Sequence, residues 1–321
     1  MKQALPLATW EQTRLLSDPR RLRLLRLLMA RPATLSQLAR AVGQSPAWVQ
    51  HHLRQLVRAG LVQAEGSAGR GRPRTYRAAA GAFVLQRLVL PESTRPTAVF
   101  VGSHDLALER LASRLAPHLD LVLYPVGSLD GLVNLRQGLC HLSGAHLLDE
   151  DGSYNLPTVR RLFPSGGVRV VTLARRVQGL MFALGNPHGI RGLEDLARPD
   201  LRFVNRNRGS GTRVWLDARL RERGIAPQAV RGYGREVATH TAAARAVAAG
   251  EADVALGLEA AARAAGLGFL PLFTERFDLI FPEEATRPLL PLLEALPGAD
   301  FRRLAGDLPG YDLAPAGTVV A

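Results

Sequence analysis

Small hydroxyl residues follow several apolar segments of the chain, each time beside a glycine. Ser103 follows Gly102, Ser128 follows Gly127, and Ser210-Gly211-Thr212 ends a polar loop. At the start of a helix, unpaired backbone N–H groups, the positive end of the helix dipole and a hydroxyl together bind an oxyanion without any lysine or arginine. Plain helix capping uses the same residue types. Their repetition along the chain favours an anion site.

The elements that must position these residues are strands and helices in alternation. Strands are expected over 98–101, 121–126 and 201–204, and helices over 106–115, 129–137 and 213–223. A weaker fourth unit places residues 236–240 before a helix over 241–249. Because alternating strands and helices form parallel sheets with right-handed crossovers, the loops after the strands gather at one sheet edge, where ligands bind.

The sequence therefore predicts an anion site built from these loops. Its expected ligand-binding residues are Ser103, His104, Ser128, Arg208, Ser210, Gly211, Thr212, Arg213, His240 and Thr241. The arginines Arg206, Arg208 and Arg213 around the Gly-Ser-Gly loop favour an anion over a neutral ligand.

Further apolar segments offer crossings between two sheets. Residues 168–174 with 179–184 supply a first crossing, and residues 267–272 with 277–281 supply a return. Two lobes follow, with lobe one at about 97–174 and 272–315 and lobe two at about 175–271.

Positive charge is concentrated at the front of the chain. Residues 1–96 hold 16 Lys and Arg against 4 Asp and Glu, a net charge of +12, whereas residues 97–321 hold 25 against 24, a net of +1. Codon bias would act on the whole chain, so this asymmetry predicts a polyanionic partner for the front part.

The front part has the pattern of a small helical domain. A helix is expected over 10–29, a second between the N-cap Thr34 and Gly43, and a third from Ser45-Pro46. The apolar spacing in the third helix turns Gln50, His51 and Arg54 outward, and residues 61–62 and 75–76 bracket a basic connection that predicts a two-stranded wing.

The amino-acid sequence of this region resembles that of the arsenic-repressor-type (ArsR-like) family. The matching sequences are DPRRLRLLRLL and TLSQLARAVGQSPAWVQHHLRQLVRAGLV, followed by the wing. The resemblance implies a winged helix-turn-helix domain over 1–92 that binds double-stranded DNA. The expected DNA-binding residues are Ser45, Gln50, His51, Arg54, Arg70, Arg72 and Arg74. Residues 70–73, Arg-Gly-Arg-Pro, match the core by which AT-hook peptides enter a narrow minor groove.

Residues 97–310 resemble the periplasmic-binding-protein-like (type II) domains that accompany helix-turn-helix heads and molybdenum-cofactor proteins. The best matches are GSHDLALERLA, GSLDGLVNLRQG, NRNRGSGTRVWLD and THTAAARAVAAGEADVALGLEAAA. The resemblance implies a ligand-sensing domain over 97–315 with a clamshell site between two lobes and molybdate or tungstate as candidate ligands. The expected fold is thus α/β, a winged helix-turn-helix followed by a two-lobed domain with mostly parallel sheets.

Composition excludes several classes of protein. The single cysteine, Cys140, leaves no internal disulfide and no thiolate metal site, and we expect neither a metal nor a cofactor. No apolar run reaches membrane-spanning length and the N-terminus lacks a signal pattern, so we expect a cytoplasmic protein without a membrane partner.

The resulting hypothesis is a homodimeric transcription regulator that senses a small anion and is not an enzyme. No spacing among His104, Asp105, Asp149 and His188 matches a metal motif or a catalytic triad. The alternatives are a DNA-binding protein whose second domain only dimerises, and an enzyme or chaperone of molybdenum-cofactor metabolism. A LysR-type regulator would have a longer linker helix than residues 78–90 allow, and a transport binding protein would have no use for a basic head.

Overall fold

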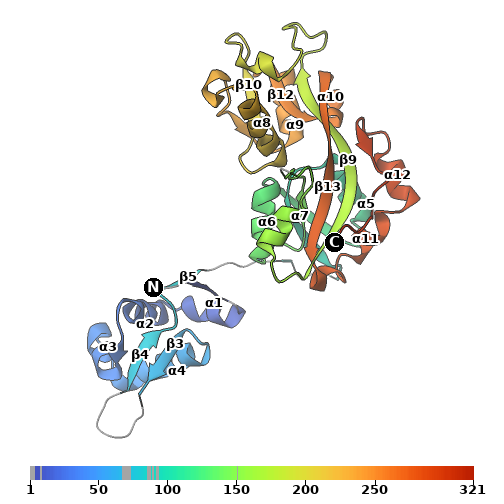
Figure 1. Cartoon of the computed structure of the whole chain (residues 1–321). Coiled ribbons are helices and arrows are strands. Elements are labelled where there is room, and N and C mark those ends of the chain that lie inside the picture. Colours follow the sequence, from blue (N-terminus) through green and yellow to red (C-terminus); the bar gives the residue numbers. More distant parts are fainter. Residues whose placement is uncertain are drawn as a thin grey trace. The chain divides into compact units, whose positions relative to one another are not determined.

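A computed structural model describes residues 4–7, 9–66, 74–84, 88, 90–91, 94–149 and 151–321. The chain divides into two compact units, Met1–Arg87 and Leu88–Ala321, which we call the head and the C-terminal unit (Figure 1). Within the described ranges, no helix has both the length and the apolar content that crossing a membrane requires.

The head is a helical domain with a small antiparallel sheet. Its elements are β1 (Ala4–Pro6), α1 (Trp10–Leu16), α2 (Pro19–Ala30), β2 (Ala33–Thr34), α3 (Leu35–Val42), α4 (Pro46–Arg58), β3 (Val62–Glu65), β4 (Thr75–Ala78) and β5 (Ala82–Val84). Strands β2, β4 and β3 form the sheet in that order, and β1 pairs with β5. Leucines from α2, α3 and α4 fill its core, among them Leu24, Leu38 and Leu53.

Short local signals place most helix ends in the head. Thr34 caps α3 in a reciprocal capping box with Gln37, and Gly43 ends this helix with a φ of 67°. Ser45 caps α4, as the sequence predicts. The single helix expected over 10–29 was wrong, because Asp18 caps a new helix and Pro19 cannot continue the preceding one.

The C-terminal unit alternates strands and helices. Its elements are β6 (Thr97–Gly102), α5 (Leu106–Leu115), β7 (Asp120–Pro125), α6 (Ser128–Arg136), β8 (Ser143–Ala145), α7 (Leu156–Leu162), β9 (Val168–Phe182), η1 (Leu193–Ala197), β10 (Phe203–Arg206), α8 (Gly211–Glu222), η2 (Pro227–Ala229), β11 (Glu236–Val237), α9 (His240–Ala248), β12 (Val254–Leu258), α10 (Glu259–Ala264), β13 (Gly268–Pro282), η3 (Glu283–Ala285), α11 (Leu290–Ala295), α12 (Ala299–Ala305) and β14 (Tyr311–Asp312).

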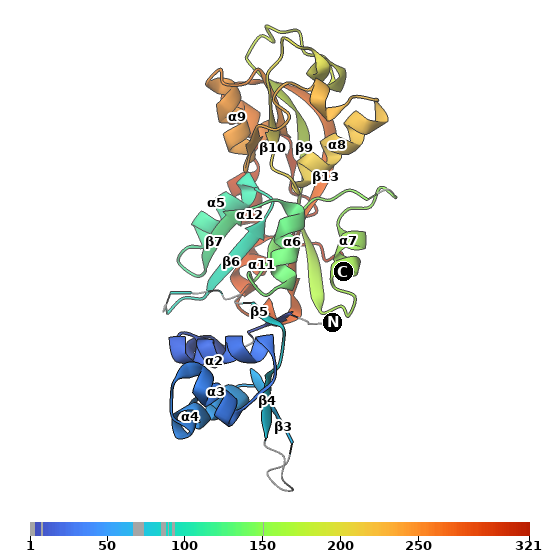
Figure 2. The same cartoon turned by 90° about the vertical axis from the view of Figure 1, so that its left-hand side faces the viewer.

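Two long strands join the two lobes of this unit. Strands β9 and β13 pair antiparallel along nearly their whole lengths and run from one lobe into the other (Figures 1 and 2). Lobe one contains β6, β7 and β8 with α5, α6 and α7, and lobe two contains β10, β11 and β12 with α8 and α9. The expected fold class is confirmed, and β9 and β13 add antiparallel ladders to the parallel pairs β6–β7, β10–β11 and β10–β12.

Each crossing is one continuous strand, whereas the sequence divided it into two apolar segments. The buried polar residues between those segments are Arg176 and Gln178 in β9 and Glu275 in β13. Glu275 lies directly opposite Arg176 in the ladder. Opposite charges paired across two strands let each strand continue through polar sequence.

Close backbone packing fixes the sheet of lobe one beside the loop of Ser103. Val101 N–H donates to Leu142 O at 3.1 Å and Ser103 N–H donates to Gly144 O at 2.9 Å, so β6 lies against the chain that leads into β8. A Cβ atom on Gly144 would lie 2.5 Å from Phe277 Cζ and 2.7 Å from the Phe100 ring. Only glycine fits there.

We therefore expect Gly144→Ala to destabilise the protein. Overpacking a filled core costs about 1–3 kcal/mol, because the rings of Phe100 and Phe277 must shift. Gly234→Ala is the matched control, since its added Cβ would meet nothing within 4 Å. Thermal unfolding of the two variants measures the difference, and equal midpoints would contradict this account of the packing.

Candidate functional site

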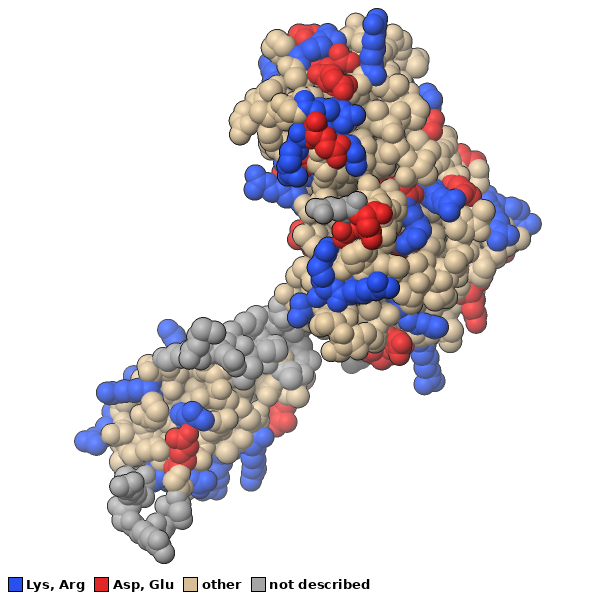
Figure 3. Space-filling view, in the orientation of Figure 1, with Lys and Arg blue, Asp and Glu red and all other residues tan. Residues whose placement is uncertain are grey.

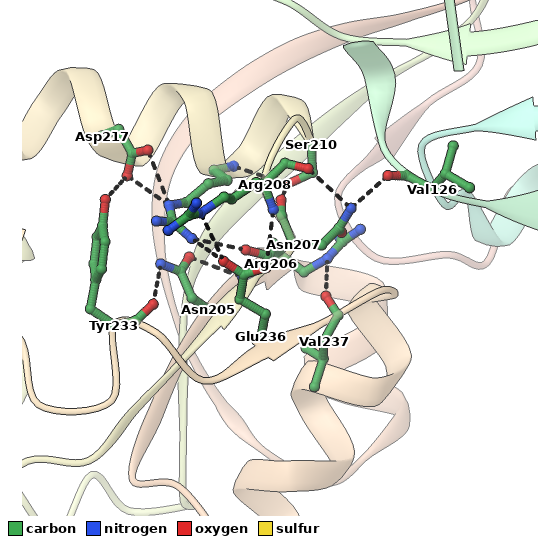
Figure 4. Close-up of polar contacts among 11 residues, drawn as sticks. Val126, Asn205, Arg206, Asn207, Arg208, Ser210, Asp217, Tyr233, Glu236 and Val237 are labelled. Carbon is green, nitrogen blue, oxygen red and sulfur yellow. Dashed lines mark hydrogen bonds and ion pairs between the residues drawn. The ribbon is translucent and has the colours of Figure 1, made fainter. Parts of the chain in front are cut away.

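The loops that begin α6 and α8 touch each other across the two lobes. Leu129 N–H in lobe one donates to Gly209 O in lobe two at 3.0 Å, and Asn207 Nδ2 donates to Val126 O at 2.6 Å (Figure 4). Gly127 packs so close to the loop of lobe two that a Cβ on it would lie 2.9 Å from Ser210 N. The structure is therefore in a closed arrangement.

A cluster of buried polar side chains lies where these loops meet the crossing strands. Its members are all less than 9% exposed: Ser103, His104, Asp105, Ser128, His146, Arg176, Gln178, Arg206, Ser210, Thr212, His240 and Glu275. We call this set the cleft cluster. It comes from both lobes and from both crossing strands, so residues up to about 170 positions apart in the sequence share one site.

Arg176 is the neutralised cation of the cleft cluster. Its Nη1 donates to Asp105 Oδ2 at 2.9 Å, its Nη2 donates to Glu275, and its guanidinium lies 4.1 Å above the ring of Phe277. Burial by itself would raise the pKa of Glu275, but the charge of Arg176 and the nearby His146 lower it to about 2. Two carboxylates therefore contact this arginine.

Arg206 is the cation of the cleft cluster that has no direct ion pair among the described residues. Its Nη2 donates to Ala238 O at 2.8 Å and its Nε to Val237 O at 3.3 Å, but its buried Nη1 has no hydrogen-bond partner (Figure 4). Among the described residues, no carboxylate lies within ion-pair distance of it. Burial, with the charge of Arg176 as a second cause, lowers the pKa of Arg206 to about 9. A buried cation without a counter-charge is costly unless an anion joins it.

Three histidines surround the two arginines. His146 Nδ1 lies 2.5 Å from Glu275 Oε2, and its backbone N–H donates to Ser128 Oγ at 3.2 Å. The ring of His240 lies 5.8 Å from that of His104, and both of its nitrogens are buried without partners in the described structure. Burial lowers the pKa of His146 and, most strongly, that of His240. Both rings are therefore neutral at physiological pH.

Two of the predicted hydroxyls are bonded inside the protein. Ser103 Oγ lies 2.9 Å from His146 Nε2, and Thr212 Oγ1 donates to Gln178 Oε1 at 2.9 Å. Gln178 Nε2 is a buried donor without a hydrogen-bond partner. The amide N–H of Gln178 is thus more available to a ligand than the hydroxyl of Thr212.

Ser210 and Ser128 begin the two facing helices. Ser210 Oγ donates to Asn207 O at 2.8 Å and accepts from Arg213 N–H at 3.2 Å, so it acts as the cap of α8. Ser128 Oγ accepts from His146 N–H, which leaves its own O–H free to donate. The proton of Ser128 is the hydroxyl proton best placed for a ligand.

Three of the expected residues lie away from the cleft cluster. The side chain of Arg208 is 87% exposed, so it points to solvent. Arg213 is buried, but it pairs with Asp217 at 2.8 Å and Glu236 at 3.0 Å and therefore holds its own loop together (Figure 4). Thr241 is partly buried, and the cap of α9 is Thr239, whose Oγ1 accepts from Ala242 N–H at 3.0 Å.

Six members of the cleft cluster were not among the expected ligand-binding residues: Asp105, Arg206 and four that no sequence pattern indicated. His146, Arg176, Gln178 and Glu275 are all buried, and none of them follows a Gly-Ser pattern. The sequence feature that could have indicated them is a charged or amide side chain in the middle of an otherwise apolar strand, such as Arg176 and Glu275. Such a residue cannot stay buried without a partner, and the sequence does not show which strand supplies it.

The head presents one exposed stripe of its last helix, α4. Gln50, His51 and Arg54 are exposed as predicted, whereas His52 is buried against the ring of Trp48. Arg58, one turn beyond Arg54, is exposed on the same stripe and was not predicted.

Other predicted DNA contacts flank this helix. Ser45 is exposed, and its Oγ accepts from Trp48 N–H at 3.2 Å. Arg74 is exposed, while Arg70 and Arg72 lie outside the described residues. On the face drawn in Figure 3, most charged side chains of the head are basic, and the C-terminal unit shows both signs.

The two buried arginines should differ sharply in their effect on stability. Arg176→Met leaves Asp105 and Glu275 buried without a cation, and we expect a loss of about 3–5 kcal/mol in the free energy of unfolding. Arg206→Met removes a charge that has no acidic partner, so the loss should stay below about 1 kcal/mol. Urea unfolding in anion-free buffer compares the two, and equal losses would argue against the charge assignment.

Comparisons with known proteins agree with this architecture. Residues 109–296 match the model of the PBP superfamily domain, and residues 18–64 match that of the bacterial regulatory protein, arsR family. The chain is 34% identical over 226 residues to the uncharacterized protein YvgK of Bacillus subtilis (strain 168). The aligned residues make up 69% of this chain and 73% of that protein. A second relative, an uncharacterized protein in the ferredoxin 2Fe-2S gene 5' region of Clostridium pasteurianum, is 34% identical over 110 residues, which are 33% of this chain and 97% of that one.

Some solved structures are similar to this chain at low sequence identity. The tungstate ABC transporter protein of Geobacter sulfurreducens is 14% identical with a TM-score of 0.47, covering 66% of this chain and 98% of that chain. An ABC-type phosphate transport receptor from Vibrio cholerae is 15% identical with a TM-score of 0.42, covering 67% and 98%. An arsR-family head implies a DNA-binding transcription regulator, and a PBP domain implies a small ligand. This chain belongs to the PBP superfamily and carries an arsR-family winged head before its ligand domain.

Proposed function

We propose that the protein is a cytoplasmic transcription regulator whose dimeric head binds double-stranded DNA and whose cleft binds a small anion. The observation that carries this proposal is Arg206, a fully buried arginine with a free Nη1 and no acidic partner among the described residues. Such a charge is stable in a closed cleft when a ligand supplies the negative charge.

Helix N-termini support the same ligand class. The helices α6, α8 and α9 begin at Ser128, Gly211 and His240, and all three residues are buried. The first N–H groups of a helix have no partner within that helix, and their dipole favours an anion. A tetrahedral oxyanion such as molybdate or tungstate matches convergent donors of this kind, and Gln178 Nε2 adds one more.

Ligand binding would regulate DNA binding by favouring closure of the lobes. Asn207 and Leu129 form direct hydrogen bonds between the lobes at the cleft. An anion bound between Arg206 and the helix N-termini favours this closed arrangement over an open one, and each tenfold preference corresponds to about 1.4 kcal/mol. The closed state would then alter how the protein binds its operator.

Retention of the cleft cluster argues against a domain that only dimerises. A buried arginine without a counter-ion lowers stability, and a domain without a ligand would gain by replacing Arg206 with an apolar residue. An enzyme or chaperone of molybdenum-cofactor metabolism would not need a basic head with an exposed recognition helix.

Anion binding should depend on Arg206 and Ser128 and be independent of Arg208. Losing one hydrogen bond to a charged ligand costs about 1.5–3 kcal/mol, so Arg206→Gln and Ser128→Ala should each weaken binding at least about tenfold. Arg208→Ala is the matched control, because its side chain is 87% exposed. Calorimetry with molybdate, tungstate, sulfate and phosphate tests this. If none of them binds, or if Arg206→Gln binds like the parent protein, the proposed ligand class is wrong.

DNA binding should be strongly salt-dependent and should depend on α4. Each phosphate neutralised by a head with a net charge of +12 over residues 1–96 releases counterions, so log affinity should fall steeply with log salt. Arg54→Ala should relax sequence preference by about 1–3 kcal/mol at one position, because its side chain is exposed on α4, the helix proposed to enter the groove. Arg208→Ala in the C-terminal unit serves as the control. Selection from a random duplex library would show an unchanged motif for Arg54→Ala if α4 does not read bases.

A further inference from the structure

Ser103, His146 and Glu275 form a buried chain that reaches from the crossing strand to the anion site. Ser103 Oγ lies 2.9 Å from His146 Nε2, and His146 Nδ1 lies 2.5 Å from Glu275 Oε2. The three residues are 0%, 2% and 1% exposed, so bulk solvent does not touch them in the closed arrangement. Ser128 Oγ accepts from the His146 backbone N–H, which places the chain against the start of α6.

The contacts among Ser103, His146 and Glu275 determine which of their atoms carry protons. Neither His146 Nδ1 nor Glu275 Oε2 has a hydrogen-bond partner of regular geometry in the described structure, and the two atoms face each other at ion-pair distance. Two lone pairs would repel at 2.5 Å, and Glu275 is ionised because Arg176 also holds it. The proton between them therefore belongs to His146 Nδ1. In a neutral ring, Nε2 is then an acceptor, and Ser103 O–H donates to it.

This proton arrangement restricts what Ser103 offers to a ligand. Because the hydroxyl of Ser103 donates its proton to His146 Nε2, Ser103 Oγ presents only lone pairs to a ligand. These lone pairs repel an oxyanion. Ser103 becomes a donor to the anion only if His146 takes a second proton on Nε2 and donates it to Ser103 Oγ. The resulting imidazolium lies between the carboxylate of Glu275 and the bound anion, where both charges favour it.

We propose that the anion site, as inferred above, binds its ligand together with one proton, held by the His146–Ser103 pair. A fully deprotonated oxyanion draws that proton from solvent onto His146. An oxyanion that carries a proton of its own can instead donate it to Ser103. The site thus distinguishes oxyanions by protonation state as well as by shape.

The groups around His146 determine the direction of the pH effect. Glu275 of β13 favours the imidazolium, whereas Arg176 of β9, Arg206 of β10 and the nearby His240 of α9 disfavour it, and burial disfavours it most. Gly211 of α8 packs against the ring and adds no charge. In the empty cleft, the pKa of His146 is therefore lowered from its ordinary value.

A bound anion raises the pKa of His146, because it offsets the charge of Arg206. Affinity for a deprotonated anion is then greatest below the pKa of the empty site. It falls by up to tenfold per pH unit as pH rises toward the pKa of the occupied site, and it levels off above that value.

Calorimetry on the full chain tests this with sulfate and tungstate between pH 5.5 and 8. Each titration is repeated in two buffers of different ionisation enthalpy, which gives the number of protons taken up. We expect uptake approaching one proton per anion. His146→Gln should bind more weakly, with no proton uptake and a flat pH profile, because Gln can donate to Glu275 and accept from Ser103 but cannot take a proton. His118→Gln, at an exposed histidine, should behave like the parent protein.

Nitrogen NMR of His146 in the anion-free protein tests the proton chain separately from the proposed anion binding. The expected state is a neutral ring with its proton on Nδ1, and a proton on Nε2 would overturn the proton chain whether or not any anion binds. Anion binding without proton uptake would overturn the chain and leave the proposed function standing. Failure of every anion to bind would overturn both.

Discussion

The ion pair between Arg176 and two buried carboxylates, Asp105 and Glu275, is the interaction on which the C-terminal unit depends. It lies where β9 and β13 pass between the lobes, and Glu275 faces Arg176 directly across the ladder. Both carboxylates contact Arg176, and Glu275 also faces His146. Arg206 in the same cleft has no carboxylate of the described residues within ion-pair distance, and the more distant Glu275 only partly offsets the burial that lowers its pKa.

This imbalance connects stability with function. Exposing Arg206 to water in an open arrangement relieves its desolvation, and closing the lobes around an anion relieves it by charge compensation. An empty closed cleft has neither benefit. The direct hydrogen bonds from Asn207 and Leu129 stabilise closure only modestly, because each net bond contributes about 1 kcal/mol. We therefore expect the position of the lobes to be sensitive to a small charged ligand.

Hydroxyl groups have a different part in the site from the one that their sequence pattern indicates. Ser210 caps α8 and Thr212 donates to Gln178, so these two residues shape the cleft, and their protons are already used. The available donors include those first N–H groups of the helices that no cap or loop uses, the Ser128 hydroxyl, and the side-chain donors Gln178 Nε2, Arg176 Nε and Arg206 Nη1. The Gly-Ser pattern leads to the buried cleft cluster, but it does not reveal that part of the hydroxyl chemistry there is already used.

Sequence by itself determined the features that local physical chemistry controls. Apolar periodicity and caps such as Thr34 and Ser45 placed the helices of the head, and strand–turn–helix units placed Ser103, Ser128 and Ser210 at the strand ends. Only the tertiary structure decided which buried charge has a partner. Arg176, Arg206 and Arg208 belong to the same residue type, yet one is paired, one is unpaired and one points to solvent. Their difference arises from contacts with residues far away in the chain, because burial and charge balance depend on what the fold brings within a few ångströms and not on sequence neighbours.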